Sequence, residues 1–162
     1  MKRLDLLANI AVIVSSIALL GFLGNQWWKS HQALQSPQAK ALIGTIVQLP
    51  GVDFTQQGKT LLIAISTNCH YCRDSESFYR QLAKTVGLKT HLIAVLPMPQ
   101  SKAESYVHSS IAPSLQVVSA SLDTIGVSGT PTLLLVDSHG KVEKAWIGKL
   151  DDASQRQVQS QL

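Results

Sequence analysis

The longest run of apolar residues in the chain lies at its N-terminus. Leu6–Gly24 holds nineteen residues without a charged side chain. At a rise of about 1.5 Å per residue, such a helix is about long enough to cross a bilayer core of roughly 30 Å. We therefore expect a single transmembrane anchor over residues 6–28. A cleaved signal peptide is the alternative, although no small-residue cleavage motif follows the run.

The residues that flank this run predict its orientation. Lys2 and Arg3 precede it, and Trp27 and Trp28 follow it. Positive charges stay on the cytoplasmic side of a membrane, and tryptophans collect where lipid meets water. We therefore expect residues 1–5 to form a cytoplasmic tail and everything beyond the anchor to lie outside the cytoplasm.

The composition changes after the anchor. Residues 29–41 are polar, rich in Gln and Ser, and interrupted by Pro37. This composition is typical of a tether between a membrane and a domain. We expect residues 29–41 to be a linker and residues 42–162 to form one folded domain.

Apolar runs and amphipathic stretches alternate along the rest of the chain. Residues 59–66 and 89–97 are aliphatic runs, typical of buried strands. Phe78, Leu82 and Val86 recur at four-residue spacing, as in an amphipathic helix. The other expected elements are a short strand and turn over 44–54, helices over 100–110 and 151–162, a helical turn over 119–127, and a strand, turn and strand over 130–148. This order predicts an α/β domain with a mixed central sheet covered by helices on both faces.

Length and charge limit the number of domains and the kinds of partner that the chain can have. The chain has 162 residues, of which 45% are hydrophobic, and a formal net charge of +4. It is long enough for one domain with a substantial core and too short for two domains of ordinary size. The sequence contains no run of Lys or Arg and no basic stripe with interleaved aromatic residues, so we expect no nucleic-acid partner.

The only two cysteines, Cys69 and Cys72, follow the first long predicted strand and enclose His70 and Tyr71. At the start of a helix, free backbone N–H groups and the helix dipole stabilise a thiolate and lower its pKa. A cysteine one turn further on can attack a mixed disulfide formed on the first. We therefore expect Cys69 to be the catalytic nucleophile and Cys72 to be the resolving thiol.

Two other uses of this pair fit the sequence less well. A metal site needs two further ligands, and the remaining histidines are not spaced as ligand pairs: His31, His91, His108 and His139. A purely structural disulfide across so short a loop would stabilise the fold little. The sequence also lacks a Gly-rich phosphate loop. We expect no metal, flavin or nucleotide cofactor.

A proline in an unusual position supports the redox interpretation. Thr130 and Pro131 stand immediately before an apolar strand, where a proline removes a ladder hydrogen bond. A strand, then Cys-His-Tyr-Cys and a helix, followed about sixty residues later by Gly-Thr-Pro-Thr, resembles the thioredoxin fold. Within it, the chain is most similar to the membrane-tethered TlpA-like and redoxin-domain proteins of bacteria, over roughly residues 44–162.

This resemblance implies a fold, an activity and a site. It implies a thioredoxin-like fold, a cis bond before Pro131, and a platform on which the backbone of Thr130 binds an extended substrate chain beside Cys69. It implies a thiol-disulfide oxidoreductase of the inner, cytoplasmic membrane with its domain in the periplasm. The implied partners are protein thiols or disulfides. The expected tether would in addition keep the domain near a membrane-bound redox partner.

The chain departs from this family around the cysteines. Asn68 stands where common thioredoxins have a tryptophan, and Ile63 stands where they have a buried aspartate. The proton acceptor for the resolving thiol is therefore open, with four candidates: His70, Asp74, Glu76 and a water molecule.

His70 and Tyr71 are expected to modulate the site. A protonated His70 near the thiolate would make the disulfide more oxidising, whereas an exposed His70 would have little influence. Tyr71 suits packing or substrate contact better than proton donation, because the ordinary pKa of tyrosine is about 10.

Two other functions stay open at this point. A peroxiredoxin-like peroxide reductase would use the spacing of Ser66 and Cys69, but Leu62 stands where such enzymes have a proline, and Cys72 would trap the nucleophile. A tethered binding module with an idle disulfide is the non-catalytic alternative. The direction of electron flow is open as well, because about 30 mV already corresponds to about 1.4 kcal/mol.

Overall fold

The computed structural model describes residues 19–21, 36–85 and 90–162. Most of the predicted anchor and the first part of the predicted linker lie outside these residues, and residues 19–21 are helical. Among the described residues, none of the helices has the length and apolar character needed to cross a bilayer. The chain divides into two units, Met1–Leu34 and Gln35–Leu162, and the second contains the predicted domain.

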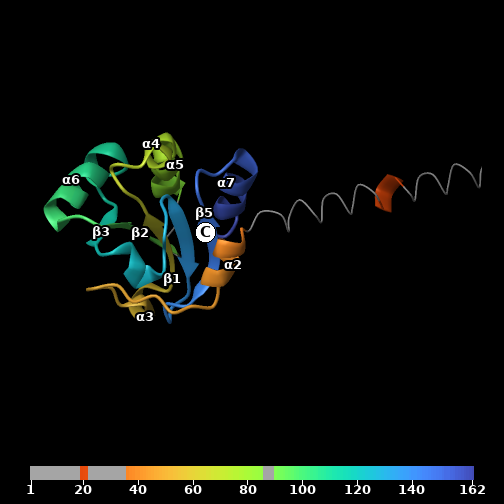
Figure 1. The fold of residues 1–162 in the computed structure, drawn as a ribbon, viewed down its shortest axis with the longest axis horizontal. Helices are drawn as coiled ribbons and strands as arrows, with labels where there is room; N and C mark the ends of the chain where they lie inside the picture. Colours follow the sequence, from red (N-terminus) through yellow and green to blue (C-terminus); the bar gives the residue numbers. More distant parts are fainter. Residues whose placement is uncertain (1–18, 22–35, 86–89) are drawn as a thin grey trace, which may run out of the picture. The chain divides into compact units, whose positions relative to one another are not determined.

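A mixed five-stranded sheet forms the centre of the second unit (Figure 1). The strand order is β3-β2-β1-β4-β5, with β1, β2 and β3 parallel and with β4 and β5 antiparallel to their neighbours. The strands are β1 (Lys59–Ala64), β2 (Thr90–Leu96), β3 (Gln116–Ser119), β4 (Thr132–Val136) and β5 (Val142–Ile147). The predicted mixed sheet is confirmed, and its central strand comes from the aliphatic run predicted to be buried.

The register of β1 decides which segments meet at each edge of the sheet. Ala64, at the carboxyl end of β1, pairs with Val95 on β2 and with Thr132 at the start of β4. Thr60, at the other end of β1, pairs with Val136. The segment after β1 and the segment before β4 therefore emerge at the same edge, although they are far apart in the sequence.

Helices cover both faces of the sheet (Figure 1). One core layer contains Leu61 and Ile63 of β1, and it packs against α4 (His70–Asp74), α5 (Glu76–Thr85), α6 (Gln100–Ser110) and α7 (Asp152–Gln159). The other layer contains Leu62 and Ala64, and it packs against α2 (Pro37–Leu42), α3 (Phe54–Gln57) and the 3-10 helix Leu122–Ile125. Neighbouring residues of β1 enter opposite layers because side chains alternate along a strand.

Helix α2 corrects the predicted linker over residues 37–41. Pro37 occupies the start of this helix, where its missing N–H costs no hydrogen bond. The Ser36 hydroxyl caps the helix by accepting a hydrogen bond from the Ala39 N–H at 3.1 Å. Ala39 is buried, and α2 packs against β5. These residues therefore belong to the domain, and a polar composition alone did not reveal the capped, partly buried helix.

Other elements also differ from the sequence prediction. The strand expected within 44–54 is only an isolated bridge of Ile46 with Lys141, and helix α3 was not predicted. The helix after the cysteines divides at Ser75, whose N–H donates to the carbonyls of Tyr71 and Cys72 at 3.2 Å each. Strand β3 was not predicted because it has four residues and lies at the sheet edge. Gln100 of α6 completes this edge: its side-chain amide donates to Val117 O at 2.9 Å and accepts from Ser119 N–H at 2.8 Å.

Candidate active site at the cysteine pair

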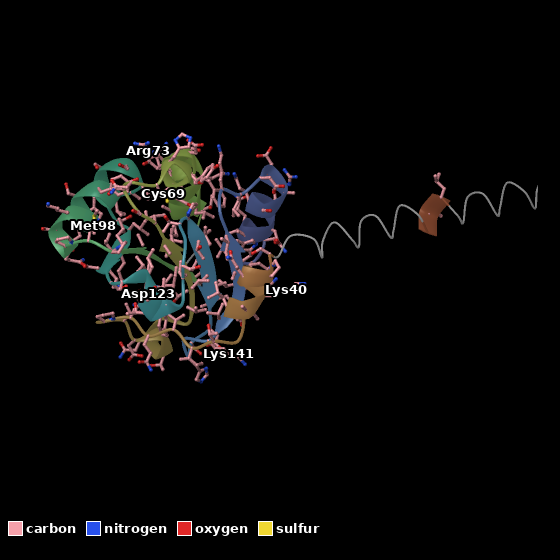
Figure 2. The ribbon with its side chains drawn as sticks, in the orientation of Figure 1. Lys40, Cys69, Arg73, Met98, Asp123 and Lys141 are labelled. Atoms are coloured by element: carbon pink, nitrogen blue, oxygen red, sulfur yellow. The ribbon has the colours of Figure 1, made fainter. Side chains whose placement is uncertain are left out.

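Cys69 occupies the N-cap position of α4, at the edge of the sheet where β1 ends (Figure 2). Its backbone is extended, with φ −96° and ψ 114°, so the helix begins only at His70. The Cys72 N–H donates a hydrogen bond to Cys69 Sγ at 3.2 Å. The sulfur therefore takes the place that a Ser or Asp oxygen usually fills at a helix start. The structure confirms the expected position of Cys69 at the helix N-terminus.

Cys72 lies in the first turn of α4 and points into the core. It is only 1% exposed, whereas Cys69 is partly exposed, and both are free thiols. Cys72 belongs to the core layer that contains Tyr79 and Trp146, and Cys69 packs at its margin. One thiol is therefore accessible to a partner molecule, and the other is accessible chiefly through the first.

The predicted platform lies directly beside Cys69. The peptide bond between Thr130 and Pro131 is cis, as the resemblance implied. The Cys69 thiol donates to the Thr130 carbonyl at 3.3 Å. The Pro131 carbonyl accepts from the Gly148 N–H at 2.7 Å, which joins this loop to the end of β5. The fold thus brings together two motifs that lie 61 residues apart in the sequence.

The surroundings of Cys69 favour its thiolate. Partial burial acts to raise its pKa, but hydrogen bonding from the Cys72 thiol and the Thr130 side chain outweighs burial. Backbone N–H groups of Cys72 and Tyr71 act in the same direction. The net result is a pKa below the ordinary value of 9.0. Cys69 is therefore the more readily ionised thiol of the pair.

The surroundings of Cys72 have the opposite effect. Burial raises the pKa of its thiol to about 12, and the hydrogen bond to Cys69 adds to this increase. A hydrogen bond from the Ser66 backbone opposes the shift only in part. Cys72 therefore stays protonated while Cys69 ionises, and its thiol hydrogen can stabilise the Cys69 thiolate.

His70 and Tyr71 lie at the exposed rim of this site. The His70 side chain is 72% exposed, and its Nε2 lies 3.6 Å from Asp74 Oδ2. Tyr71 is 58% exposed, and its ring centroid lies 5.8 Å from that of His70. Both residues can contact a bound partner, and His70 lies beside a carboxylate.

Several polar groups near the pair were not identified from the sequence. Lys149, in the loop after β5, donates to Asp74 Oδ2 at 2.8 Å, and this hydrogen bond is the main reason why the pKa of Asp74 is lowered. The Tyr106 hydroxyl of α6 donates to Glu76 Oε1 at 2.8 Å. Burial, followed by the Glu76 contact, raises the pKa of Tyr106. These partners come from distant parts of the chain, so no local spacing could have indicated them.

The described part of the chain offers no group of three or more His, Cys, Asp or Glu side chains that could hold a metal ion. The cysteine pair itself has one buried, protonated member, and such a thiol is a poor metal ligand. The arrangement instead suits covalent sulfur chemistry between an accessible thiolate and a nearby protected thiol.

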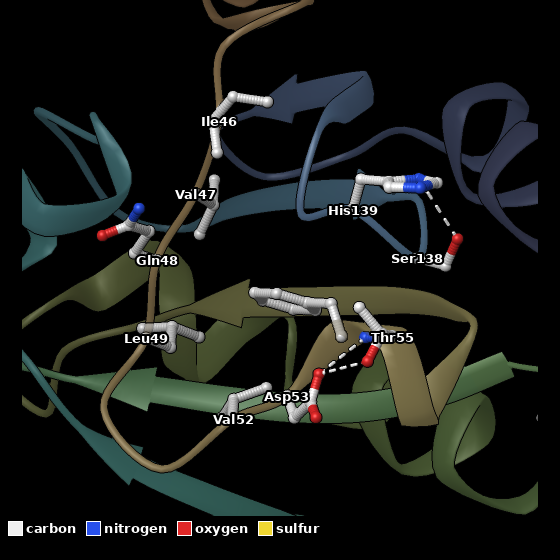
Figure 3. Close-up of a pocket in the computed structure, with 10 residues that line it drawn as sticks. Ile46, Val47, Gln48, Leu49, Val52, Asp53, Thr55, Ser138 and His139 are labelled. Carbon is white, nitrogen blue, oxygen red and sulfur yellow. Dashed lines mark hydrogen bonds between the residues drawn. The ribbon is translucent and has the colours of Figure 1, made fainter.

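A pocket of about 300 Å³ lies at the opposite end of the sheet, and Figure 3 shows it. Val47, Phe54 and His139 are among the residues that line it. His139 follows β4, whose last residue Val136 pairs with the start of β1. This pocket therefore lies far from Cys69, and it contains neither cysteine nor the cis-proline.

Comparison with known protein families gives no match to this sequence. No curated protein sequence matches it either.

Solved structures, in contrast, match the fold of the domain. A protein described as thiol:disulfide interchange protein DsbE from Chlorobium tepidum matches with a TM-score of 0.58 and 21% identity, over 74% of this chain and 94% of its own. The exposed lipoprotein thioredoxin Etrx1 of Streptococcus pneumoniae matches with a TM-score of 0.54 and 20% identity, over 67% and 87%. StoA from Bacillus subtilis matches with a TM-score of 0.52 and 18% identity, over 64% of this chain and 81% of its own. The chain therefore has the thioredoxin-like fold.

Proposed function

We propose that the protein is a thiol-disulfide oxidoreductase that acts on protein thiols and disulfides through Cys69 and Cys72. One observation carries this proposal: a partly exposed thiol with a lowered pKa lies three residues from a buried thiol with a raised pKa. A structural disulfide needs no such asymmetry. Thiol-disulfide exchange needs this asymmetry, because one sulfur must attack a partner while the other stays protonated.

In the reductive direction, the Cys69 thiolate attacks one sulfur of a substrate disulfide. A bond forms between Cys69 and that sulfur, the substrate disulfide breaks, and the second substrate sulfur leaves as a thiolate that takes up a proton. The Cys72 thiol then loses its proton and attacks Cys69. The bond between Cys69 and the first substrate sulfur breaks, that sulfur leaves as a thiolate and takes up a proton, and Cys69 and Cys72 are left joined as a disulfide. The oxidative direction runs the same steps backwards.

The loop before β4 supplies the binding platform for the mixed disulfide. The Thr130 carbonyl accepts from the Cys69 thiol at 3.3 Å, so it lies at the point of attack. Once Cys69 is bonded to a substrate sulfur, its hydrogen is gone, and this carbonyl becomes free to accept from a substrate N–H. An extended substrate chain can therefore pair with the backbone of Thr130 in the manner of an added strand.

We also propose that the protein is anchored in the cytoplasmic membrane with its domain on the extracytoplasmic side, in the periplasm. The charge-free run Leu6–Gly24, the preceding Lys2 and Arg3, and the following Trp27 and Trp28 support this placement. A tether would keep the domain close to a membrane-bound redox partner. Disulfide chemistry is also favoured outside the cytoplasm, where thiols are not kept reduced by the glutathione pool.

Trapping the mixed disulfide tests the proposed function. Replacing Cys72 by serine leaves the nucleophile in place and removes the thiol that releases the substrate. We expect Cys72→Ser to accumulate a covalent adduct with a disulfide-containing protein, seen as a mass increase that dithiothreitol reverses. Cys69→Ser is the matched control and should form none. Equal adduct formation by both variants would contradict the assigned roles.

A further inference from the structure

A groove of about 340 Å³ lies between α2, the loop before β4, and the adjoining ends of β4 and β5. Its lining includes Ala41 and Leu42 of α2, Val127 and Gly129 of the loop, Thr132 of β4 and Ile147 of β5. None of these side chains is charged. Leu42, Val127 and Ile147 give it apolar walls, while hydroxyl and amide groups lie among them. The groove therefore suits an uncharged, largely apolar group.

This groove is continuous with the proposed substrate platform. Gly129 and Thr132, which line it, flank Thr130 and Pro131 on either side. Thr132 also pairs with Ile147 across the ends of β4 and β5, next to the Gly148 N–H that binds the Pro131 carbonyl. A chain lying along Thr130 would thus pass over the mouth of the groove.

The groove and Cys69 lie on opposite faces of the sheet. Leu133 belongs to the core layer against which Cys69 packs. Thr132 precedes Leu133 on β4, so its side chain points to the other face, where α2 packs through Ala39. An extended peptide presents successive side chains to opposite sides. When a substrate cysteine points to Cys69, a neighbouring side chain points toward the groove.

We propose that this groove binds the apolar side chain of a residue directly next to the substrate cysteine. The inference rests on the proposed function and adds a substrate preference to it. A leucine-sized side chain buried there would leave water and strengthen the encounter complex, whereas a polar or absent side chain would not. Partial burial of such a side chain corresponds to about a tenfold faster reaction.

The chain offers a matched pair of variants on α2. Ala41 is exposed and lines the groove, so Ala41→Phe would fill it without disturbing the core. Lys40 is exposed on the same helix and is not among the lining residues, so Lys40→Phe is the control (Figure 2). Gly129 provides a second blocking position, because a Cβ added there meets no atom within 4 Å. Gly129→Leu therefore covers the case in which Ala41→Phe fails to fold.

The experiment uses the full chain, reduced and in detergent, with short peptides whose single cysteine carries a thionitrobenzoate group. One peptide has leucine on both sides of the cysteine, and the other has serine. Attack by Cys69 on the peptide sulfur releases thionitrobenzoate, which is followed by its absorbance. We expect the leucine peptide to react about tenfold faster than the serine peptide. The ratio should fall toward one in Ala41→Phe and in Gly129→Leu and stay unchanged in Lys40→Phe.

Two results would overturn this inference. The first is equal rates for both peptides with the unmodified protein, and the second is an equal rate ratio in Ala41→Phe and Lys40→Phe. A small symmetrical disulfide, too short to reach the groove, separates these failures from failure of the proposed function. If the protein reduces the small disulfide but does not distinguish the peptides, only the groove assignment is wrong. If it reduces neither the small disulfide nor the peptides, the proposed function fails as well.

Discussion

At the scale of single residues, the two cysteines differ because of where each lies along α4. Cys69 caps the helix and receives hydrogen bonds from the chain around it, while Cys72 lies one turn further on, inside the core. Three positions in sequence are therefore enough to move the two pKa values in opposite directions. The proposed division of labour between an attacking and a resolving thiol rests on this difference.

Alkylation as a function of pH measures this difference directly. Iodoacetamide reacts with thiolates, so modification of each cysteine accelerates as the pH rises through its pKa. In the reduced protein we expect Cys69 to reach half of its maximal rate below pH 9.0. Cys72 should stay unmodified over the pH range in which the protein remains folded, because its pKa is about 12. Peptide mapping by mass spectrometry separates the two sites, and a common midpoint would contradict the assignment.

The two sequence-based alternatives for His70 give different reduction potentials. Its side chain is 72% exposed and lies beside Asp74 rather than in the core. Exposed charge pairs contribute little because water screens them. We expect His70→Ala to change the potential of the Cys69–Cys72 couple by less than about 20 mV. A substantially larger decrease, measured in glutathione buffers, would show that the imidazolium stabilises the thiolate.

At the scale of elements, a contact between two distant turns closes the end of the sheet opposite the cysteine pair. The turn between β4 and β5 packs against the segment before α3: the Val47 N–H donates to the Gly140 carbonyl at 2.8 Å. Gly140 has a φ of +75°, and a Cβ there would lie 2.6 Å from the Val47 carbonyl oxygen. This position therefore requires glycine for two separate reasons.

Gly140→Ala tests this packing, with Gly51→Ala as its control. Gly51 has a similar φ of +71°, but a Cβ there meets no atom within 4 Å. Left-handed backbone alone costs roughly 1–2 kcal/mol for a residue with a Cβ. We expect Gly51→Ala to lose about that much free energy of unfolding in urea, and Gly140→Ala to lose at least about 1 kcal/mol more because of the clash. Equal losses would show that the Val47 segment moves aside freely.

The elements that could be predicted from the sequence share one property, which is a strong local pattern. Strands β1 and β2 come from long aliphatic runs, and α6 spans the predicted residues Gln100–Ser110. Strand β3 and helix α2 are short, and tertiary contacts stabilise them: the side chain of Gln100 binds the edge of β3, and β5 packs against α2. The local pattern of hydrophobic residues does not reveal such contacts.

The features of the candidate site likewise fall into two groups, those with a local sequence pattern and those without one. The position of Cys69 at a helix start followed from a strand, two cysteines and an amphipathic helix in sequence. The contact between Cys69 and Thr130 spans 61 residues, and only a resemblance between motifs indicated it. The ion pair of Lys149 with Asp74 and the bond of Tyr106 with Glu76 had no sequence signal, because they depend on how loops and helices pack.

At the scale of the whole molecule, we propose that the folded domain carries out the reaction and that the N-terminal tether only places it at the membrane. The cysteine pair and the cis-proline platform both lie in the unit Gln35–Leu162. We expect deletion of residues 1–29, with export supplied by a cleavable signal peptide, to leave reduction of a small disulfide unchanged in vitro. Cycling in cells, measured as the fraction of oxidised Cys69–Cys72, should shift, because we propose that the redox partner is membrane-bound. An unchanged fraction would contradict the proposed role of the tether.

The central claim is that Cys69 and Cys72 form a reversible disulfide with each other. Equilibrating the protein in glutathione buffers of graded potential and counting free thiols by mass spectrometry tests it most directly. We predict one two-electron transition between a dithiol and an intramolecular disulfide, with a midpoint of about −270 mV for a reductant or about −120 to −180 mV for a disulfide donor or isomerase. A protein whose cysteines never join reversibly would contradict the account.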